Sequence, residues 1–264
     1  MGSISFGPLL FSSEQIATIV SVVAFLVTSW VLGKLVDDSL NRSSSTFVAL
    51  FFVAARAGYV IEHWRTFSDE PVRALFVWQG GLSLSAGVAA LVVATWFGFK
   101  DMKLRGLGLV PILVAGVVLG AARLFVPASA GLPLPKISLE TVDEQKVSFE
   151  GLRGRPLVIN LWASWCPPCR RELPMMAEFA HGHDAATFVC ANQEESRETI
   201  ASFLSQQGVT LDTVAMDVDG RLRRYYQARG LPTTLFIDGQ GVVHSVTVGE
   251  ISKEALTDAI DSLK

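Results

Sequence analysis

The chain has 264 residues, of which 50% are hydrophobic and 18% are charged, and its formal net charge at pH 7 is −3. A mean hydropathy of +0.40 is too high for an ordinary soluble protein and indicates membrane-spanning segments. Residues 1–130 hold 9 Lys and Arg against 7 Asp and Glu, and residues 131–264 hold 13 against 18. Neither half has the basic stripe that nucleic-acid binding needs, so this class of function is excluded.

The first half contains four apolar stretches long enough to span a bilayer. We place the spans at Gln15–Val36, Thr46–Ile61, Leu82–Phe99 and Leu107–Val126, and we expect the second to be the short one. The sequence offers no amphipathic helices that would cover these stretches in a soluble core. It therefore predicts a transmembrane domain of about four helices over residues 1–130.

The charges between the spans predict how this domain is oriented, because cytoplasmic loops carry an excess of Lys and Arg. The first and third connectors hold five such residues, whereas the second holds only Arg65 and Arg73. Both termini are therefore predicted to lie outside, in a multi-pass membrane protein. The N-terminus lacks the basic start of a cleavable signal peptide. Small residues at 127–131 leave cleavage after Ala130 as an alternative to an uncleaved last helix, which we favour.

Two motifs of the membrane half are Arg56–Val60 (RAGYV) and Trp78–Ser83 (WQGGLS). Through them, the stretch from about residue 15 to residue 99 resembles the first helices of the prolipoprotein diacylglyceryl transferase family. The His–Gly–Gly of that family is replaced by Ser85–Gly87, and its later Gly-Arg-Ile-Gly-Asn signature is absent. We therefore interpret this half as a truncated membrane module without transferase activity. Arg56 lies within a span, so it is either paired or functional.

From Gly131 the pattern changes to short strands that alternate with helices, after a Pro-rich stretch interpreted as a linker. The predicted strands are Ile137–Leu139, Lys146–Phe149, Pro156–Leu161, Ala186–Ala191, Asp212–Met216, Thr233–Ile237 and Val242–Val248. The predicted helices are Pro167–Ala180, Ser196–Gln207, Gly220–Arg229 and Lys253–Leu263. This alternation predicts an α/β domain over residues 131–264, with a central mixed sheet covered by helices on both faces.

Two cysteines separated by two residues, Cys166 and Cys169, stand where a predicted strand leads into a predicted helix. This pattern is typical of a redox-active dithiol. A zinc site is the main alternative, but it requires two more Cys or His ligands. The third cysteine, Cys190, falls in an apolar predicted strand and is expected to be a buried, inert thiol.

The placement of the two cysteines predicts different roles for them. Cys166 lies at the helix N-terminus, where free N–H groups and the helix dipole stabilise a thiolate. Arg170 and Arg171 add positive charge nearby. Cys169 lies one turn further on, close enough to attack a mixed disulfide that Cys166 has formed. Trp165, just before the nucleophile, is expected to line the surface where a protein partner docks.

A resemblance to a known family rests on Asn160–Cys169, Glu172, Pro174 and Gly230–Asp238 (GLPTTLFID). Over about residues 134–263, the chain resembles the thioredoxin-like, membrane-anchored TlpA, ResA and CcmG group of bacterial thiol–disulfide oxidoreductases. The resemblance implies that Pro232 is a cis-proline beside the dithiol. It further implies that the backbone of Leu231 faces outward to pair with a substrate strand.

The resemblance also implies a role for Glu172, one helical turn after Cys169. Thioredoxins carry a buried Asp on the strand before the dithiol, but the residue here is Asn160, which cannot take up a proton. If Glu172 is partly buried, its pKa should rise, and the carboxylate can then accept the proton of Cys169. The alternative is an exposed Glu172 that pairs with a nearby Arg.

These expectations combine into a membrane-anchored periplasmic thiol–disulfide oxidoreductase that reduces protein disulfides. The candidate residues are Cys166, Cys169 and Glu172 for catalysis and Trp165, Leu231 and Pro232 for substrate binding. No cofactor or metal beyond the cysteine pair is expected. Residues 1–130 contain no cysteine, so a separate membrane donor must supply electrons. The resemblance implies a DsbD- or CcdA-like donor and substrates such as apocytochrome c. An oxidase or isomerase and, ranked lower, a copper chaperone are the alternatives.

Overall fold

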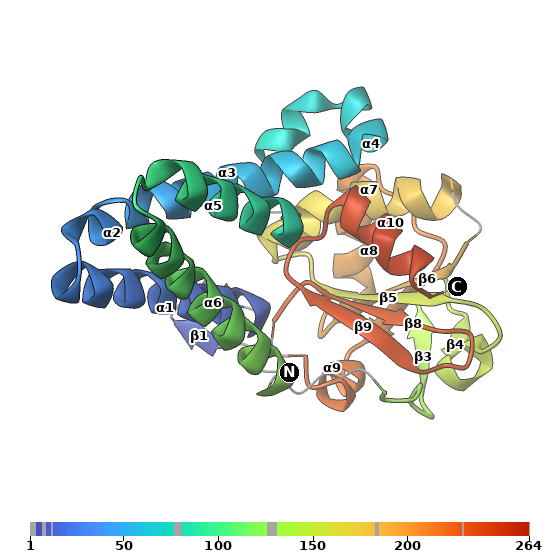
Figure 1. The fold of residues 1–264 in the computed structure, drawn as a ribbon. Helices are drawn as coiled ribbons and strands as arrows, with labels where there is room; N and C mark the ends of the chain where they lie inside the picture. Colours follow the sequence, from blue (N-terminus) through green and yellow to red (C-terminus); the bar gives the residue numbers. More distant parts are fainter. Residues whose placement is uncertain are drawn as a thin grey trace. The chain divides into compact units, whose positions relative to one another are not determined.

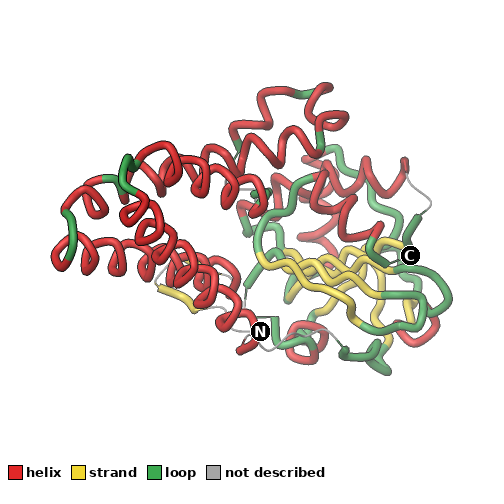
Figure 2. The backbone as a smooth tube through the Cα atoms, viewed as in Figure 1, coloured by secondary structure: helices red, strands yellow, loops and turns green. Residues whose placement is uncertain are grey.

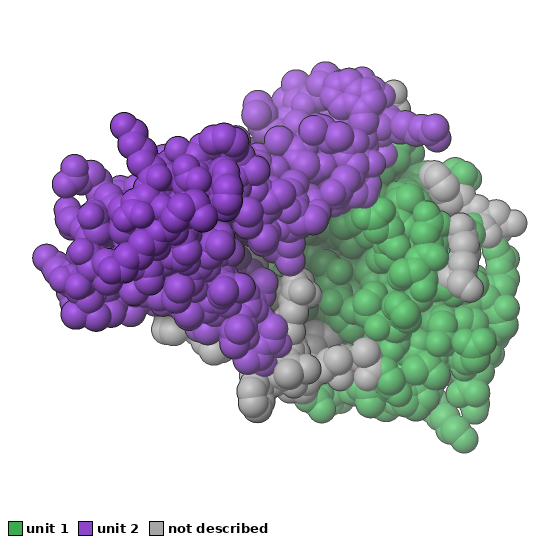
Figure 3. All heavy atoms as spheres, viewed as in Figure 1, with its two compact units in different colours: residues 1–10, 127–264 green, residues 11–126 purple. Residues whose placement is uncertain are grey.

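The computed structural model describes residues 4–6, 9–11, 13–76, 81–125, 131–182, 185–228 and 230–263. The chain divides into two compact units, residues 11–126 and residues 127–264 together with the first ten residues (Figure 3). Within those first residues, β1 (Ile4–Phe6) pairs with β2, which covers Leu9–Phe11. The predicted boundary and the alternative cleavage at Ala130 both fall outside the described residues, so both stay predictions.

Helices build the unit of residues 11–126 (Figures 1 and 2). They are α1 (Ser13–Leu35), α2 (Asp38–Arg42), α3 (Ser44–Glu62), α4 (Trp64–Asp69), the 3₁₀ helix η1 (Pro71–Leu75), α5 (Leu84–Gly98) and α6 (Met102–Phe125). Three segments are long and apolar enough to cross a membrane: Ile16–Leu35, Ser39–Glu62 and Met102–Ala122. Large apolar side chains such as Val53 and Val117 are exposed on them, as expected where lipid is the neighbour.

The short apolar helix is α5, so the prediction that the second span is the short one is wrong. The 15 residues of α5 extend about 22 Å at ~1.5 Å per residue, which is less than the ~30 Å of a typical hydrocarbon core. This helix starts late because the N–H of Ser83 donates to the carbonyl of Ala55 at 2.9 Å, which holds the preceding chain against α3. In contrast, α3 starts two residues before the predicted Thr46.

Small residues let α3 and α5 pack closely. A Cβ atom at Gly58 would collide with the Cβ of Ala86. A Cβ at Gly87 would come within 2.6 Å of the ring of Phe51. The absence of side chains at these two glycines therefore allows the close van der Waals contact that joins helices in lipid.

Arg56 in α3 is paired, which favours a structural role for this charge. Its guanidinium donates to three backbone carbonyls: Nε to Ala74 at 2.9 Å, Nη1 to Gly81 at 3.0 Å and Nη2 to Arg73 at 3.0 Å. Its Cζ atom also lies 5.8 Å from the ring centre of Tyr59 and 5.5 Å from that of Phe67. Arg56 therefore connects η1 and Gly81, which lies shortly before α5, to α3.

We expect Arg56→Lys to lower the melting temperature of the full-length protein in detergent by about 4–8 °C. A Lys ammonium cannot span three carbonyls, and a hydrogen bond to a charged group contributes about 1.5–3 kcal/mol. A loss of 1 kcal/mol lowers the melting temperature of a chain of this size by about 2–4 °C. Arg65→Lys, at an exposed position of α4, is the matched control and should change nothing. Equal melting temperatures for the two variants would contradict this role of Arg56.

A seven-stranded mixed sheet forms the centre of the other unit, in the order β4-β3-β7-β6-β5-β8-β9. Its strands are β3 (Ser138–Thr141), β4 (Lys146–Ser148), β5 (Leu157–Trp162), β6 (Thr187–Gln193), β7 (Val214–Asp217), β8 (Thr233–Ile237) and β9 (Val243–Val248). The pairs β5–β6 and β6–β7 are parallel, and the other neighbours are antiparallel. The predicted α/β fold with a central mixed sheet is confirmed.

The central strand β5 is buried on both faces, and its side chains alternate between two layers. The odd-numbered residues pack with the 3₁₀ helix η3 (Phe149–Leu152) and the short helix α9 (Arg221–Tyr225). The even-numbered residues face the layer of α7 (Pro167–Gly182), α8 (Arg197–Gln207) and α10 (Lys253–Asp261). Figure 1 shows these three helices on one side of the sheet. Asn160 is the polar member of the even set, so its amide points toward α7.

Most helix ends of this unit follow their sequence signals. Ser196 caps α8, because its side chain accepts a backbone N–H of the first turn. Gly208 ends α8 with a φ of 63°, a conformation that glycine adopts without strain. In contrast, α9 ends at Tyr225, well before the predicted end at residue 229. Gln227 takes a φ of 52°, which stops the helix.

The Pro-rich stretch after residue 130 is not a free linker, which corrects the prediction. Its backbone pairs with the start of β9: Gly131 N donates to Val243 O at 2.7 Å, Val243 N to Leu132 O at 2.9 Å, and Leu134 N to Gly241 O at 2.8 Å. Pro133 does not interrupt this pattern, since the donors lie on either side of it. The stretch therefore covers part of the outer edge of β9.

Candidate active site

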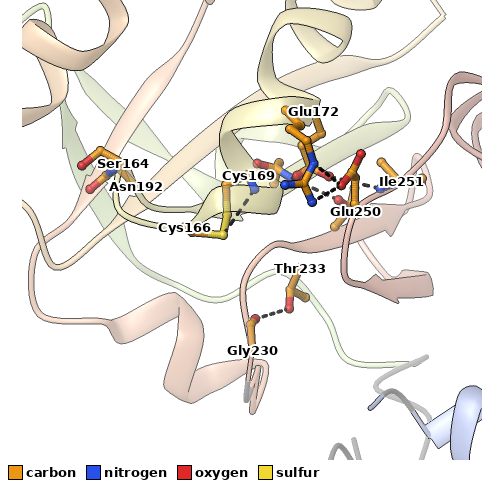
Figure 4. Close-up of a disulfide and its surroundings, with 12 residues drawn as sticks. Ser164, Cys166, Cys169, Glu172, Asn192, Gly230, Thr233, Glu250 and Ile251 are labelled. Carbon is orange, nitrogen blue, oxygen red and sulfur yellow. Dashed lines mark hydrogen bonds and ion pairs between the residues drawn. A yellow bond between two sulfur atoms is a disulfide. The ribbon is translucent and has the colours of Figure 1, made fainter. Parts of the chain in front are cut away.

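Cys166 and Cys169 form a disulfide at the junction of β5 and α7, with their Cα atoms 5.3 Å apart (Figure 4). The carbonyl of Cys166 accepts the N–H of Arg170 at 3.1 Å, so Cys166 is the residue that caps α7. The N–H of Cys169 donates to the Sγ atom of Cys166 at 3.3 Å. The sulfur of Cys166 therefore lies where a helix N-terminus stabilises a thiolate.

The two arginines after the disulfide do not both offer their charge to Cys166, which corrects a prediction. The guanidinium of Arg171 is paired with Glu250, whose Oε2 lies 2.6 Å from Nη2 and 2.9 Å from Nε. Arg170 lies over the ring of Phe203, with its Cζ atom 5.6 Å from the ring centre. The positive charge of Arg171 is thus largely neutralised by a carboxylate.

Glu172 is buried, with only 2% of its surface exposed. One carboxyl oxygen, Oε1, accepts the side-chain N–H of Asn160 at 2.8 Å. The other, Oε2, accepts the backbone N–H of Ile251 at 3.1 Å. The alternative of an exposed Glu172 that pairs with an Arg is therefore wrong.

Burial raises the pKa of Glu172 from 4.5 to about 8, because the charged form loses its water. The hydrogen bonds from Asn160 and Ile251 favour the carboxylate and act against this effect, but burial outweighs them. The negative charge of Glu250 raises the pKa further, and the positive charge of Arg171 lowers it. Glu172 can therefore exchange a proton near neutral pH.

Asn160 occupies the strand position expected from the sequence and connects two elements. Its Nδ2 donates to Glu172 and also to the hydroxyl of Thr234 on β8 at 3.1 Å. Its Oδ1 accepts no hydrogen bond from any residue that the structure describes. Asn160 thus orients the carboxyl group of Glu172 but has no proton of its own to exchange.

The peptide bond between Leu231 and Pro232 is cis, as the resemblance implied. Leu231 packs against the apolar cluster that contains both cysteines of the disulfide. Gly230 and Thr233 flank these two residues, and Figure 4 shows both of them in the surroundings of the disulfide. Trp165 is 66% exposed immediately before Cys166. The three predicted substrate-binding residues therefore border the dithiol, and their contact with a substrate stays a prediction.

The segment between β9 and α10, residues 249–251, was missed by the sequence reasoning. The N–H of Gly249 donates to the carbonyl of Pro232 at 2.8 Å. Glu250 pairs with Arg171, and the N–H of Ile251 donates to Glu172. The 249–251 segment therefore joins the cis-proline loop to the helix that carries the dithiol.

A second group that the sequence reasoning missed holds the loop before Cys166. The carboxylate of Glu195 accepts the backbone N–H of Ser164 at 2.7 Å and also the hydroxyl of Ser164. The amide of Asn192 donates to the same carboxylate at 2.7 Å. Because β5 and β6 are parallel, the residues after both strands meet at one edge of the sheet. This geometry is the signal that could have found Glu195.

Cys190 is buried in β6, as predicted, and burial raises the pKa of its thiol to about 12. The negative charge of Glu172 acts in the same direction. Such a thiol does not form a reactive thiolate near neutral pH. Among the residues that the structure describes, no group of three His, Cys, Asp or Glu side chains is placed to hold a metal, so the zinc alternative gains no support.

Comparisons with known proteins separate the two halves of the chain. Residues 130–246 match the family model described as AhpC/TSA family. Residues 15–124 match the one described as prolipoprotein diacylglyceryl transferase. The membrane half thus matches the family whose first helices its motifs resemble.

Curated relatives match the half that carries the dithiol. The thiol-disulfide oxidoreductase ResA of Bacillus subtilis is 29% identical over 138 residues, which are 52% of this chain and 76% of that protein. The thiol:disulfide interchange protein DsbE of Escherichia coli K12 is 28% identical over 139 residues, 52% of this chain and 74% of that protein. A crystal structure of a thiol:disulfide interchange protein from Chlorobium tepidum is 30% identical, covers 50% of this chain and 96% of its own, and has a TM-score of 0.45.

Proposed function

Because the C-terminal half of this chain belongs to the thioredoxin-like thiol–disulfide oxidoreductases, we propose that the protein reduces disulfides of extracytoplasmic proteins. The observation that carries this proposal is the Cys166–Cys169 pair at the start of α7, with the buried carboxyl group of Glu172 one turn further on. The pair supplies the electrons, and Glu172 handles a proton.

The reaction runs in two exchange steps that start from the reduced pair. The Cys166 thiolate attacks a substrate disulfide, forms a mixed disulfide and releases one substrate thiolate. Glu172 then takes the proton of Cys169, and the resulting thiolate attacks the Sγ atom of Cys166. This second attack releases the other substrate sulfur as a thiolate. The substrate gains two electrons and, on protonation, two protons, and the pair ends as a disulfide.

The charges around the pair favour the reducing direction. A dithiol is a strong oxidant when its reduced form is stabilised, above all by a stabilised thiolate. Here Arg171 is paired with Glu250, and Pro167 and Pro168 lack N–H groups that could face the sulfur. Arg170 lies over the ring of Phe203, and the side chain one turn after Cys169 is the carboxyl group of Glu172. These features make the reduced form a better electron donor.

We further propose that residues 1–130 anchor the domain in a bacterial inner membrane through four crossings, the short helix α5 included. Both termini and the dithiol then lie on the periplasmic side. The distribution of Lys and Arg between the spans supports this orientation. The membrane half holds no cysteine, so a DsbD- or CcdA-like membrane protein would reduce the pair. Substrates of the class of apocytochrome c fit this role. The chemistry needs no cofactor beyond the cysteine pair.

A membrane-impermeant maleimide tests location and direction together in living cells with a permeabilised outer membrane. We expect a label on Cys166 without prior reduction, because a periplasmic reductase is kept reduced. The Cys166→Ser/Cys169→Ser double variant should take no label until denaturation exposes Cys190, which is buried. Labelling only after lysis would contradict the periplasmic location. Labelling only after reduction would contradict the reducing direction.

The same dithiol acting as an oxidase or isomerase is the second candidate, and the reduction potential separates the two. A value near that of thioredoxin, roughly −270 mV, is expected for a reductase, and a value near that of DsbA, roughly −120 mV, for an oxidase. Equilibration of the full-length protein with dithiothreitol and glutathione buffers, followed by thiol labelling, gives the value.

A further inference from the structure

Two consecutive residues of α7 contact two consecutive residues of the 249–251 segment. Arg171 pairs with Glu250, and Glu172 accepts the backbone N–H of Ile251. Figure 4 shows Glu172, Glu250 and Ile251 grouped at the turn of the helix that follows the disulfide. The ion pair and the acid group therefore lie side by side.

The two partners of the ion pair differ in their exposure. The side chain of Glu250 is 7% exposed, whereas that of Arg171 is 55% exposed. Water and salt screen a charge that is held inside the protein less than one on its surface. The negative charge of Glu250 therefore acts on its buried neighbour more strongly than an exposed carboxylate would.

The other titratable groups near Glu172 are neutral or otherwise engaged. Cys169 is in the disulfide, Cys190 is a neutral thiol, Lys253 pairs with Glu178 at 3.5 Å, and Glu254 is buried in the first turn of α10. Glu250 and Arg171 are the charges that act on Glu172. They act in opposite directions, since a nearby anion favours the protonated acid and a nearby cation favours the carboxylate.

We propose that Glu250 is a positioning residue of the dithiol site, whose carboxylate binds the guanidinium of Arg171 and by its own charge keeps a proton on Glu172. This inference rests on the proposed function, because the proton of Glu172 matters only if Cys169 resolves mixed disulfides. Without Glu250, the freed Arg171 and the missing negative charge both favour the ionised form of Glu172. Glu250 thereby sets the pH at which Cys169 becomes an efficient nucleophile.

Two variants that remove one partner each should shift the pH dependence in opposite directions. We expect Glu250→Gln to move the ionisation of Glu172 to lower pH by about 0.5–1 unit, and Arg171→Gln to move it to higher pH by a similar amount. The double variant removes one negative and one positive charge and should return close to the wild type. If the ion pair only held the two segments together, both single variants would shift the ionisation of Glu172 in the same direction.

Two measurements on the full-length protein in detergent read this shift. Ellman's reagent forms a mixed disulfide with the reduced protein, and the release of its second thiolate reports the attack by Cys169 at each pH. Carbon-13 NMR of labelled glutamate reports the ionisation of Glu172 directly, with no need for exchange activity. Glu178→Gln, on the same helix and paired with Lys253, is the control and should leave both curves unchanged.

Opposite shifts in the two single variants, cancelled in the double variant, support the inference. NMR curves that coincide in all variants overturn it, whatever the exchange rates are. If the NMR curves shift as expected but no second thiolate is released in any protein, Glu250 has the proposed effect and the proposed function fails.

Discussion

Cys169→Ser should convert the protein into a trap that accumulates mixed disulfides with its natural substrates and no longer turns over. Cys166 still attacks, but serine cannot release the bound partner, so the covalent intermediate persists. Non-reducing gels of cells that express the variant should show bands of higher mass that vanish with dithiothreitol. Mass spectrometry of these bands would name the substrates. The rate of repeated substrate reduction should fall to the uncatalysed background.

The matched control leaves a single thiol at the other position of the pair. In Cys166→Ser the remaining Cys169 is buried inside the first turn of α7 and does not lie at the helix N-terminus, so it should form few or no mixed disulfides. A Cys190→Ser variant with an intact pair should turn over normally and trap nothing. Equal trapping by Cys169→Ser and Cys166→Ser would contradict the assignment of Cys166 as the nucleophile.

Glu172→Gln should slow the resolution step on the order of 100-fold at neutral pH, the usual contribution of a general base. In the wild type, this step should accelerate as pH rises through about 8, where Glu172 ionises. In the variant, the rate should depend only on the ionisation of the Cys169 thiol, so the acceleration should occur at higher pH. The two-stage release from Ellman's reagent measures the step. An unchanged rate between about pH 6 and pH 9 would disprove the role of Glu172.

A stability measurement separates this role from a merely structural one. Glu172 has a higher pKa in the folded state, about 8, than its usual 4.5, so the folded protein keeps a proton that the unfolded chain loses. Its contribution to stability is fully present below pH 4.5 and is lost as pH rises through about 8. Glu172→Gln should remove this loss, so its melting temperature should change less than that of the wild type between pH 5 and pH 8.

Local patterns were enough to predict the parts of the site that neighbours in the sequence determine. The apolar run at β5, the cysteine pair and the helix after it share one short stretch, so the position of Cys166 at the start of α7 followed from spacing alone. The cis bond before Pro232 followed from a motif. The burial of Glu172 was expected only in part. Helix spacing predicts the face of α7 on which Glu172 lies, but it does not predict which residues cover that face.

Contacts between distant residues could not be predicted in this way. Glu250 lies 79 positions after Arg171, and Ser164 lies 31 positions before Glu195, so no helix or strand period relates them. The sequence could not show that the charge of Arg171 is paired, because its partner Glu250 comes from a different element. Similarly, the length of α5 depends on where Ser83 is fastened to α3, which no hydropathy pattern records.

The burial of Cys190 determines which sulfur atoms of the domain can form its disulfide. Three thiols allow three different pairings, and a protein with three reactive sulfurs can rearrange its own disulfide. With the third thiol enclosed in β6 and protonated, only the pairing of Cys166 with Cys169 remains. The domain therefore has two redox states: a dithiol, which can donate one pair of electrons, and a disulfide, which can accept one pair. Each exchange with a donor or a substrate transfers one pair.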